Sequence, residues 1–458
     1  MVVPGHTARV RRAALILLLG LPIIACERRA PRQAVLITID TLRADHVGAR
    51  RGGIPLTPAL DRLAADSVRY LDVLANASTT LTSHVSMLSG LYPWRHRVIS
   101  NRHELAPDIA WLPQALRAEG FATGAVVSST TLKRETGLDR GFDVYDDRFD
   151  SAEINRATQL VKTPAETTTA ALSWLAEHGR RDFFLWVHYL PPHGPYTPPD
   201  EFLRDLPRTE SGIQLPLSSE NWAEGTVPMY QRLDGQQDPE AYRRAYAGHV
   251  RYVDHHVGRL LDRLRELGLY DQALVVVASD HGESLGEHDW YFCHGNVVYQ
   301  EQVAIPLLIK LPANRDAGRV INAPVEGVDV APTVLHALGM DDLLHADGRV
   351  IVDAALGDGS RPRFTQSDNA EVLAAVVDGT KLVLRVTDEA LAGPSHPARA
   401  LYALDRDPAE MNPLAGDAPP TMAGLEAALR QRYEAIPRAP RIVSPQQEER
   451  LRALGYTR

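Results

Sequence analysis

Short apolar runs alternate with amphipathic stretches along most of the chain. Continuous apolar runs that are typical of buried strands occupy residues 34–40, 121–129, 182–190, 273–280 and 303–310. Capping residues, a stop glycine and one-sided apolar spacing are the signals of helices. These signals predict helices that begin at Thr57-Pro58 or span residues 106–120 and 239–267. Strands that alternate with helices favour an α/β fold with a doubly wound, mainly parallel sheet.

Polar side chains stand where three of the predicted strands end. Asp40, His188 and Asp280 each follow, or lie at the end of, an apolar run. In open α/β sheets, ligands bind at the carboxyl ends of the strands. We therefore expect these three residues to share one site.

Two regions depart from this alternation of strands and helices. We expect residues 34–339 to form a catalytic domain, in which the polar, proline-containing stretch 198–238 is either a lid over the substrate or disordered. Further on, "EVLAAVVDGTKLVLRV" at 371–386 has an Asp-Gly turn between alternating strands. This hairpin predicts a small C-terminal α+β subdomain over residues 340–458.

The N-terminus has the pattern of a secretory signal. Three arginines precede "AALILLLGLPIIA" at 13–25, an apolar run that is short for a transmembrane span. The run ends in "IIAC", which resembles the bacterial lipobox and predicts a lipoprotein signal peptide over 1–25, a lipidated Cys26 and a tether over 26–33. The alternative is a plain secretory signal or membrane anchor. The first interpretation places the protein outside the cytoplasm, as a bacterial lipoprotein held on the lipid bilayer through Cys26.

Composition and charge limit the classes of partner and the role of the cysteines. The 458 residues are 44% hydrophobic and carry a net charge of −9, and no compact basic cluster follows the first dozen residues. These features argue against nucleic acid as a partner. With Cys26 acylated, Cys293 would be the single free thiol, and we expect it to be a buried apolar residue rather than a reactive one.

The stretch "VVVASDHGESLGEHDWYFCHG" at 275–295 suggests a metal site. Asp280 and His281 are adjacent at a predicted strand end, and Asp40 offers a second carboxylate from another strand end. Carboxylate and neutral imidazole together suit Mn²⁺ or Zn²⁺, and Ca²⁺ with added oxygens. The alternative is a solvated acidic loop, but the glycine-rich setting after a buried strand favours one divalent metal ion.

The stretch "TTLTSHVSMLSG" from Thr79 to Gly90 is rich in hydroxyls and leads into a predicted helix. Hydroxyls are poor nucleophiles unless a base or a metal activates them. A threonine or serine of this stretch, placed on the predicted metal, would gain that activation. Capping of the helix is the alternative role.

Several ordered motifs resemble the sulfatase family of the alkaline-phosphatase superfamily. They are "VLITIDTLRADHVG", "TTLTSHVSMLSGLYPWRHRV", "HYLPPHGPYTPP", "VVVASDHGESLGEH", "VDVAPTVLHALG", "LYALDRDPAEMNPLA" and "ERLRALGY". The similarity extends from about Val35 to the end of the chain. It implies an alkaline-phosphatase-like α/β fold and an enzyme that acts on an anionic ester. By position, it assigns the metal ligands to Asp40, Asp280 and His281.

The same alignment places the family's nucleophile at Thr80. Sulfatases carry Cys or Ser there, Pro two places on and Arg four places on, and they convert the first residue to formylglycine. This chain has Thr80, Thr82 and His84 instead, and threonine cannot yield the aldehyde. The departure argues against ordinary hydrolysis of a sulfate ester.

Threonine as nucleophile resembles the phosphoryl branch of the superfamily. That branch includes nucleotide phosphodiesterases and enzymes that move phosphoethanolamine or glycerol phosphate. In it, the hydroxyl attacks phosphorus in line, and water or an acceptor alcohol releases the phosphothreonine. Members with two metals need a second set of ligands. Asp254 with His255, or His188 with His193, fits that spacing poorly, so we expect Thr80 to act with a single metal ion, Mn, Zn or Ca.

Further histidines are assigned by the same resemblance. His193 in "PPHGPY" is expected to protonate the leaving oxygen, and His84, in place of the family's Arg, to contact the transferring group. The alternative for His84 is a helix-capping or surface role. His188 is either a support for the site or a core histidine.

His294 is expected to contact the substrate directly, His288 belongs to the predicted lid contacts, and Lys133 would hold an oxyanion unless it is solvated.

Together these features predict a metal-dependent hydrolase of an anionic ester, most simply a phosphoester or a phosphonate, with Thr80 as the nucleophile. Three alternatives remain. They are a phosphoryl-group transferase to an envelope glycan or lipid, a formylglycine-independent sulfuric ester hydrolase, and a non-catalytic envelope binding protein. The last is disfavoured because the four residues that a catalytically inactive relative would be expected to lose in part are all present: Asp40, Thr80, Asp280 and His281.

Overall fold

A computed structural model describes residues 1–2, 32–149, 161–222, 224–353, 360–386, 397–415, 420–434, 436, 445–453 and 455. The chain divides into two units, Met1–Pro31 and Arg32–Arg458, and every element below belongs to the second. The predicted signal peptide (apart from residues 1–2), the lipidated Cys26 and the tether up to residue 31 lie outside the described residues. Within the described part of the chain, no helix is long and apolar enough to cross a membrane.

An eight-stranded sheet forms the centre of the second unit, in the order β13-β4-β12-β9-β1-β8-β6-β7. Its strands are β1 (Gln33–Ile39), β4 (Val68–Tyr70), β6 (Ala122–Val126), β7 (Val144–Asp146), β8 (Phe183–Tyr189), β9 (Leu274–Ser279), β12 (Leu307–Lys310) and β13 (Val320–Ile321). The pairs from β9 through β1, β8 and β6 to β7 are parallel, whereas β12 runs antiparallel to both of its neighbours. The predicted mainly parallel sheet is therefore confirmed.

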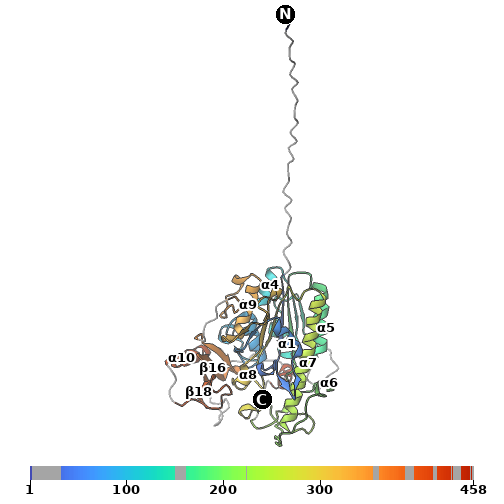
Figure 1. The fold of residues 1–458 in the computed structure, drawn as a ribbon. Coiled ribbons are helices and arrows are strands. Elements are labelled where there is room, and N and C mark those ends of the chain that lie inside the picture. The colour runs from blue at the N-terminus through green and yellow to red at the C-terminus, as the bar shows by residue number, and fades with distance from the viewer. Residues whose placement is uncertain are drawn as a thin grey trace. The chain divides into compact units, whose positions relative to one another are not determined.

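Helices cover both faces of this sheet (Figure 1). One face carries α1 (Pro58–Ala65), α5 (Pro164–His178) and α7 (Pro239–Glu266). The other face carries α2 (Thr80–Ser89), α4 (Leu112–Ala118) and α9 (Val330–Ala337). Side chains of β1 alternate between the two cores, since Ile37 packs in the first and Leu36 in the second. A strand with apolar side chains on both faces explains the unbroken apolar run in the sequence.

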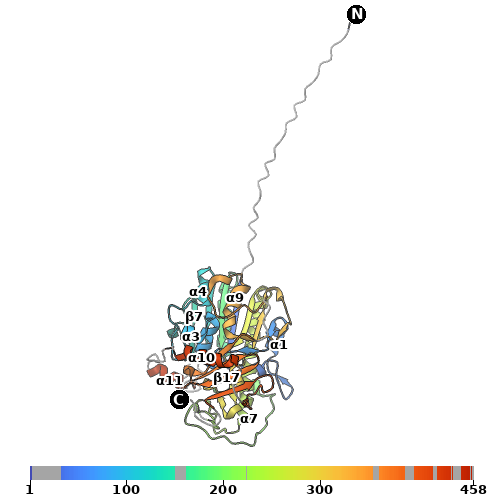
Figure 2. The same ribbon diagram turned by 90° about the vertical axis from the view of Figure 1, so that its left-hand side faces the viewer.

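A smaller antiparallel sheet follows, made of β15 (Arg363–Gln366), β16 (Val372–Val377), β17 (Thr380–Arg385) and β18 (Arg399–Ala403). Helix α10 (Pro420–Glu434) packs against β16 and β17 (Figure 2), and α11 (Pro445–Ala453) is the last helix. Asp378 and Gly379 form the predicted turn with φ of 48° and 71°. The hairpin and the small α+β region are confirmed, while the boundary between residues 339 and 340 stays a prediction.

Two predicted elements are shorter in the structure. The helix expected over 106–120 contracts to α4, because Trp111 has an extended backbone and Pro113 fits only the first helical turn. The strand expected over 303–310 begins at Leu307, because Gln300–Val303 forms the short helix α8.

Residues 198–238 form mostly irregular chain around α6 (Asp200–Leu203) and η4 (Met229–Gln231). Their role as a lid stays a prediction.

The remaining short elements are β2 (Arg50–Arg51), β3 (Ile54–Pro55), β5 (Val73–Leu74), α3 (Pro93–His96), β10 (Ser284–Leu285), β11 (Tyr291–Cys293) and β14 (Val325–Glu326).

Candidate active site

Three neighbouring strands bring the predicted polar residues together. Strand β1 lies between β8 and β9, and all three are parallel. Asp40 follows β1, Asp280 follows β9, and His188 in β8 pairs in register with Thr38. The carboxyl ends of adjacent parallel strands meet at one edge of the sheet, so these side chains share one buried location.

Helix α2 brings Thr80 to the same edge. Thr79, with extended backbone, precedes the helix, and Gly90 ends it in the left-handed conformation that glycine adopts easily. The Ser83 hydroxyl donates to the Asp280 carbonyl at 2.6 Å, which fixes the helix against β9. The side chain of Asn101 accepts the Leu81 N–H at 2.8 Å. Thr80 is therefore held at the first helical position by contacts on both of its sides.

Asp40, Asp280 and His281 form a group whose ligand atoms lie within 4.8 Å of one another. His281 Nδ1 donates to the Gly282 carbonyl at 2.9 Å, so the lone pair of the neutral ring is on Nε2. That nitrogen lies 3.5 Å from Asp280 Oδ2, 3.9 Å from Asp40 Oδ1 and 3.3 Å from the Thr80 hydroxyl. Two carboxylates, one imidazole nitrogen and one hydroxyl thus converge.

The carboxylates of Asp40 and Asp280 have few hydrogen bonds, which suits the binding of a cation. Both oxygens of Asp40 and Oδ2 of Asp280 are buried, and within the described residues they have no hydrogen-bond partner. Burial and the neighbouring Asp280 raise the pKa of Asp40 well above its usual value, and burial also raises the pKa of Asp280. Two neighbouring buried carboxylates with few donors are costly to keep ionised unless a cation compensates their charges. The donor set therefore fits one divalent metal ion, and its oxygen and nitrogen ligands suit Mn²⁺ or Zn²⁺, or Ca²⁺ with further oxygens.

A second group, His84 with His188 and Asp280, has similar spacing, but the ring nitrogens that face the carboxylates carry protons and therefore cannot bind a metal ion. His84 Nδ1 donates to the Thr80 carbonyl at 2.8 Å. His188 Nδ1 accepts the Ser128 N–H at 3.3 Å, so its proton is on Nε2, which lies 3.4 Å from Asp40. Both nitrogens of this group that face the acids therefore carry protons. This arrangement fits the expectation of a single metal ion.

His84 is engaged on both of its ring nitrogens. Its Nε2 lies 3.0 Å from the Thr38 hydroxyl, which also accepts the Trp186 indole N–H at 2.9 Å. Burial lowers the pKa of His84, in keeping with a neutral ring. In this structure the ring supports the Thr80 backbone, and its predicted contact with the transferring group stays a prediction. His188 Nε2 likewise lies 3.4 Å from Asp40, and its role as a support for the site or as a core histidine stays a prediction.

His193 and His294 lie beside the metal group. Their ring centroids are 4.9 Å apart, and the ring of His294 lies 4.5 Å from that of His281. His193 Nδ1 donates to the Gly194 carbonyl at 2.7 Å, and His294 Nδ1 lies 3.1 Å from a carboxylate oxygen of Glu283. Proton exchange of either ring with a substrate would therefore take place at Nε2. Burial lowers the pKa of each ring to about 3.

Glu283 and Asn101 were not among the residues expected from the sequence. Glu283 is fully buried, and burial raises its pKa to about 7, although His193 and His281 act in the opposite direction. The signal for Glu283 was its place two residues after His281 in the metal motif. Asn101 has no such signal, because its bond to Leu81 depends on the tertiary fold.

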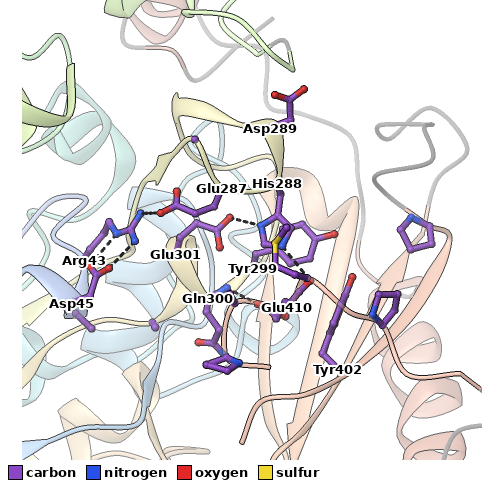
Figure 3. Close-up of a pocket in the computed structure, with 18 residues that line it drawn as sticks. Arg43, Asp45, Glu287, His288, Asp289, Tyr299, Gln300, Glu301, Tyr402 and Glu410 are labelled. Atoms are coloured by element: carbon purple, nitrogen blue, oxygen red, sulfur yellow. Dashed lines mark hydrogen bonds and ion pairs between the residues drawn. The ribbon is translucent and has the colours of Figure 1, made fainter. Parts of the chain in front are cut away.

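Lys133 and His288 have other neighbours in the structure than the metal-group residues. Lys133 Nζ is 5.2 Å from the centre of the Phe149 ring, and its role as an oxyanion contact stays a prediction. His288 stacks on Tyr299 with 3.7 Å between ring centroids and contacts Glu301 at 3.0 Å. It lines a groove of about 1110 Å³ between residues 43–45, 286–289 and 299–304 on one side and residues 397–413 on the other (Figure 3). The groove includes Arg43 but none of the metal-group residues.

Comparison with known proteins agrees with this geometry. Residues 32–340, more than half of the chain, match the profile of the family Sulfatase, and the chain belongs to that family. It is 26% identical over 396 residues to the multifunctional alkaline phosphatase superfamily protein PehA of Trinickia caryophylli, which covers 70% of this chain and 76% of the relative. It is 22% identical over 359 residues to an arylsulfatase of Clostridium perfringens, which covers 66% and 73% respectively.

The fold is also that of a solved enzyme. The phosphonate monoester hydrolase SpPMH from Silicibacter pomeroyi superimposes with a TM-score of 0.65 at 22% identity, over 88% of this chain and 94% of that one. The predicted family and the alkaline-phosphatase-like fold are confirmed. The protein is a sulfatase-like ester hydrolase of the alkaline-phosphatase superfamily, metal-dependent like its family and directed at anionic esters.

Proposed function

We propose that this enzyme hydrolyses a phosphoester or a phosphonate with Thr80 as the nucleophile. The observation that carries the proposal is the position of the Thr80 hydroxyl, 3.3 Å from His281 Nε2 and beside the buried carboxylates of Asp40 and Asp280. A threonine cannot become formylglycine, so the nucleophile here is the hydroxyl itself. A phosphonate as substrate is supported by the structural neighbour named as a phosphonate monoester hydrolase.

Asp40, Asp280 and His281 would hold one divalent cation, with the Thr80 hydroxyl as the fourth donor. When bound, such a cation supplies Lewis-acid polarisation of the ester and lowers the cost of ionising the hydroxyl. His188 and His84 fix the geometry, since one lies against Asp40 and the other holds the Thr80 carbonyl. These residues act by positioning, which is the main contribution of proteins to phosphoryl transfer.

The reaction would proceed in two displacements. Thr80 Oγ gives its proton to solvent and forms a bond to phosphorus, while the bond between phosphorus and the leaving oxygen breaks. His193 gives the leaving oxygen a proton from Nε2, because Nδ1 is committed to the Gly194 carbonyl. Burial favours the neutral ring, so the charge of a bound anionic ester must favour the protonated form before this step. Water then attacks phosphorus and releases Thr80.

The test uses a soluble form of the protein that starts at residue 27. Matched aryl esters of phosphate (monoester and diester), phosphonate and sulfate would be assayed with Mn²⁺, Zn²⁺ or Ca²⁺, for the wild type and Thr80→Ala. Thr169→Ala on the exposed side of α5 is the matched control. We expect phosphoryl turnover that Thr80→Ala abolishes and Thr169→Ala retains, together with a phosphorylated Thr80 peptide in acid-quenched samples.

Other outcomes would point to the alternative functions. Turnover of the sulfate ester through Thr80 would identify a formylglycine-independent sulfuric ester hydrolase. Turnover only with added glycerol or a sugar as acceptor would identify a phosphoryl-group transferase. Metal binding without turnover of any ester would identify a binding protein and overturn the proposal.

We also propose that the full-length protein is a lipoprotein on the outer side of a bacterial membrane. The support is the sequence "IIAC" after an apolar run, with Cys26 as the acylated residue. We expect wild-type protein in the membrane fraction, with a diacylated N-terminal peptide in its mass spectrum. Cys26→Ala should be soluble or unprocessed, and a wild type without acyl chains would contradict the proposal.

A further inference from the structure

Five buried polar side chains near the first turn of α2 leave hydrogen-bonding capacity unused. Within the described residues, one polar atom of each has no hydrogen-bond partner. They are Ser78 Oγ, Thr79 Oγ1, Asn101 Nδ2, Gln366 Oε1 and Asp368 Oδ1. Each of these side chains is at most 7% exposed. Because the large majority of buried polar atoms in folded proteins are paired, a group of five around one helix end indicates a place where a polar ligand completes the bonding.

The segments that carry these atoms hydrogen-bond to one another. The Ser78 N–H donates to the Gln366 carbonyl at 2.9 Å, which joins the end of β15 to the chain before α2. The Gln366 side chain in turn donates to the Ile99 carbonyl at 3.2 Å, two residues before Asn101. The Asp368 N–H donates to the Gly295 carbonyl at 2.8 Å. Residues far apart in the sequence are thereby brought to the same end of α2.

This group borders the reacting residues. Gly295 directly follows His294, and a side chain at Gly295 would lie 3.3 Å from the methyl carbon of Thr79. Thr79 in turn precedes Thr80. Thr79 therefore lies next to the nucleophile, and the other four residues are linked by hydrogen bonds to the segments on either side of it, without belonging to the metal group.

The turn that follows Asp368 has a backbone conformation that is unfavourable for residues other than glycine. Asn369 and Ala370 both have positive φ, 52° and 55°, although neither is glycine. The Asn369 N–H donates to the Ile99 carbonyl at 2.9 Å, and the Asn369 amide lies 3.3 Å from Asp368 Oδ2. The turn thus holds Oδ2, the Ser100 side chain is a further hydrogen-bond partner of the carboxylate, and Oδ1 has no partner within the described residues. Burial raises the pKa of Asp368 to about 7, while Ser100 and Arg102 act in the opposite direction.

The unused atoms include both donors and acceptors. Asn101 Nδ2 can only donate, Gln366 Oε1 and an ionised Asp368 Oδ1 can only accept, and the two hydroxyls can do either. A hydroxyl also donates and accepts, so a group with several hydroxyls satisfies such a mixed set, whereas an alkyl chain or a plain aryl ring leaves it unpaired. A site built to bond hydroxyls rejects analogues that lack them.

We propose that these five side chains form a subsite for the alcohol part of the ester and select a polyhydroxylated alcohol, with Asp368 as the main specificity residue. The proposal rests on the ester hydrolysis proposed above and adds its substrate class. It assigns a role to the small C-terminal sheet, since Gln366 and Asp368 lie at and just after the end of β15.

The experiment compares two esters with the same reacting group. Glucose 6-phosphate and n-hexyl phosphate both release a primary alcohol, and only the first carries further hydroxyls. If the first assay shows turnover of phosphonates alone, the corresponding phosphonate monoesters replace them. The measured quantity is the ratio of kcat/KM for the two esters in each enzyme preparation. This ratio does not depend on the folded fraction of a variant.

We expect the wild type to favour the sugar ester by at least about tenfold. Asp368→Ala should lower kcat/KM for the sugar ester by about 10- to 100-fold and change the hexyl ester by less than about threefold, the size expected for a lost hydrogen bond to a charged group. Asp368→Asn keeps the shape and an acceptor oxygen, and should fall between the two. The control is Asp378→Asn, which removes the same charge at the exposed turn of the same sheet and should leave the ratio unchanged.

The outcomes separate this inference from the proposed function. An equal loss for both esters in Asp368→Ala, or a wild type that favours the hexyl ester, would overturn the subsite while leaving ester hydrolysis intact. If no ester is turned over, the proposed function fails. Binding of the same two esters to the metal-loaded wild type and Asp368→Ala, measured by calorimetry, then decides the subsite: tighter binding of the sugar ester that depends on Asp368 supports it, and equal binding overturns it.

Discussion

Two buried aspartates, each followed by histidine, have opposite surroundings. Asp254 in α7 accepts the N–H groups of Ala59 and Leu60, both at 2.9 Å, with one carboxylate oxygen for each. Asp280 uses only Oδ1 in this way, with the N–H groups of His281 and Thr41, and its Oδ2 lacks a hydrogen-bond partner within the described residues. Both are almost completely buried, at 2% and 0% exposure.

The difference identifies their roles. Both oxygens of Asp254 accept N–H groups of the first turn of α1, so the carboxyl group has a structural role there and no oxygen is left for a metal ion. Asp280 lies beside Asp40, whose two oxygens are also without partners, and such a pair requires a cation. The sequence motifs and their spacing set Asp254 aside as a metal ligand, but they did not explain what it does. The account of hydrogen bonds supplies that explanation.

The strongest test of these two roles is one substitution at each aspartate. We expect Asp280→Asn to lower kcat/KM at least about 100-fold at saturating metal, because it removes a ligand charge, whereas Asp254→Asn should stay within about threefold. Steady-state assays with the best ester of the first screen provide the measurement, and calorimetry reports metal affinity. Comparable losses in both variants would show that the unpaired Oδ2 of Asp280 does not mark the metal site.

The fold was largely predictable because its signals are local. Buried parallel strands are continuous apolar runs, so β1, β8 and β9 could be found from the sequence, and with them the strand-end positions of Asp40 and Asp280. The family motifs then supplied Thr80 and His281. These assignments need only short stretches of sequence.

The rest of the site depends on contacts between distant segments. The proton positions that make His188 and His84 supports are set by the Ser128 N–H and the Thr80 carbonyl, which periodicity does not reveal. Asn101 and Asp368 likewise approach α2 only in the folded chain, one through Leu81 and the other through Gly295. Tertiary hydrogen bonds of this kind have no sequence pattern of their own.

A second, smaller effect concerns stability with and without metal. Free metal at about 100 times its dissociation constant stabilises the folded state by about 2.7 kcal/mol, so the Tm of the wild type should rise by several degrees. Asp280→Asn should lose that rise, and without metal it should be at least as stable as the wild type, since it removes one of two neighbouring buried charges. Calorimetric scans with EDTA and with each metal test this. A metal-free Asp280→Asn protein that is clearly less stable than the wild type would mean that Asp280 is mainly structural.

The smallest effect is a pH dependence at Asp254. Burial raises its pKa to about 7 in the folded protein, against about 3.9 in an unfolded chain, while the N–H groups of Ala59 and Leu60 act in the opposite direction. The folded state therefore holds this proton more tightly. Its contribution to stability is complete below about pH 4 and is lost as pH rises to about 7.

Asparagine has no proton to lose at this position, so the comparison with Asp254→Asn isolates that contribution. We expect the variant to be the less stable protein at pH 5, because its amide offers one acceptor oxygen where the carboxyl group offers two, and we expect the gap to narrow by pH 8. Denaturant midpoints in EDTA at the two pH values measure it, with Asp378→Asn as the control for loss of an exposed charge. A gap that widens with pH would mean that the two N–H groups stabilise the ionised carboxylate more than burial opposes it. The α1 terminus would then be a genuine anion site, and the contrast with Asp280 would rest on the metal alone.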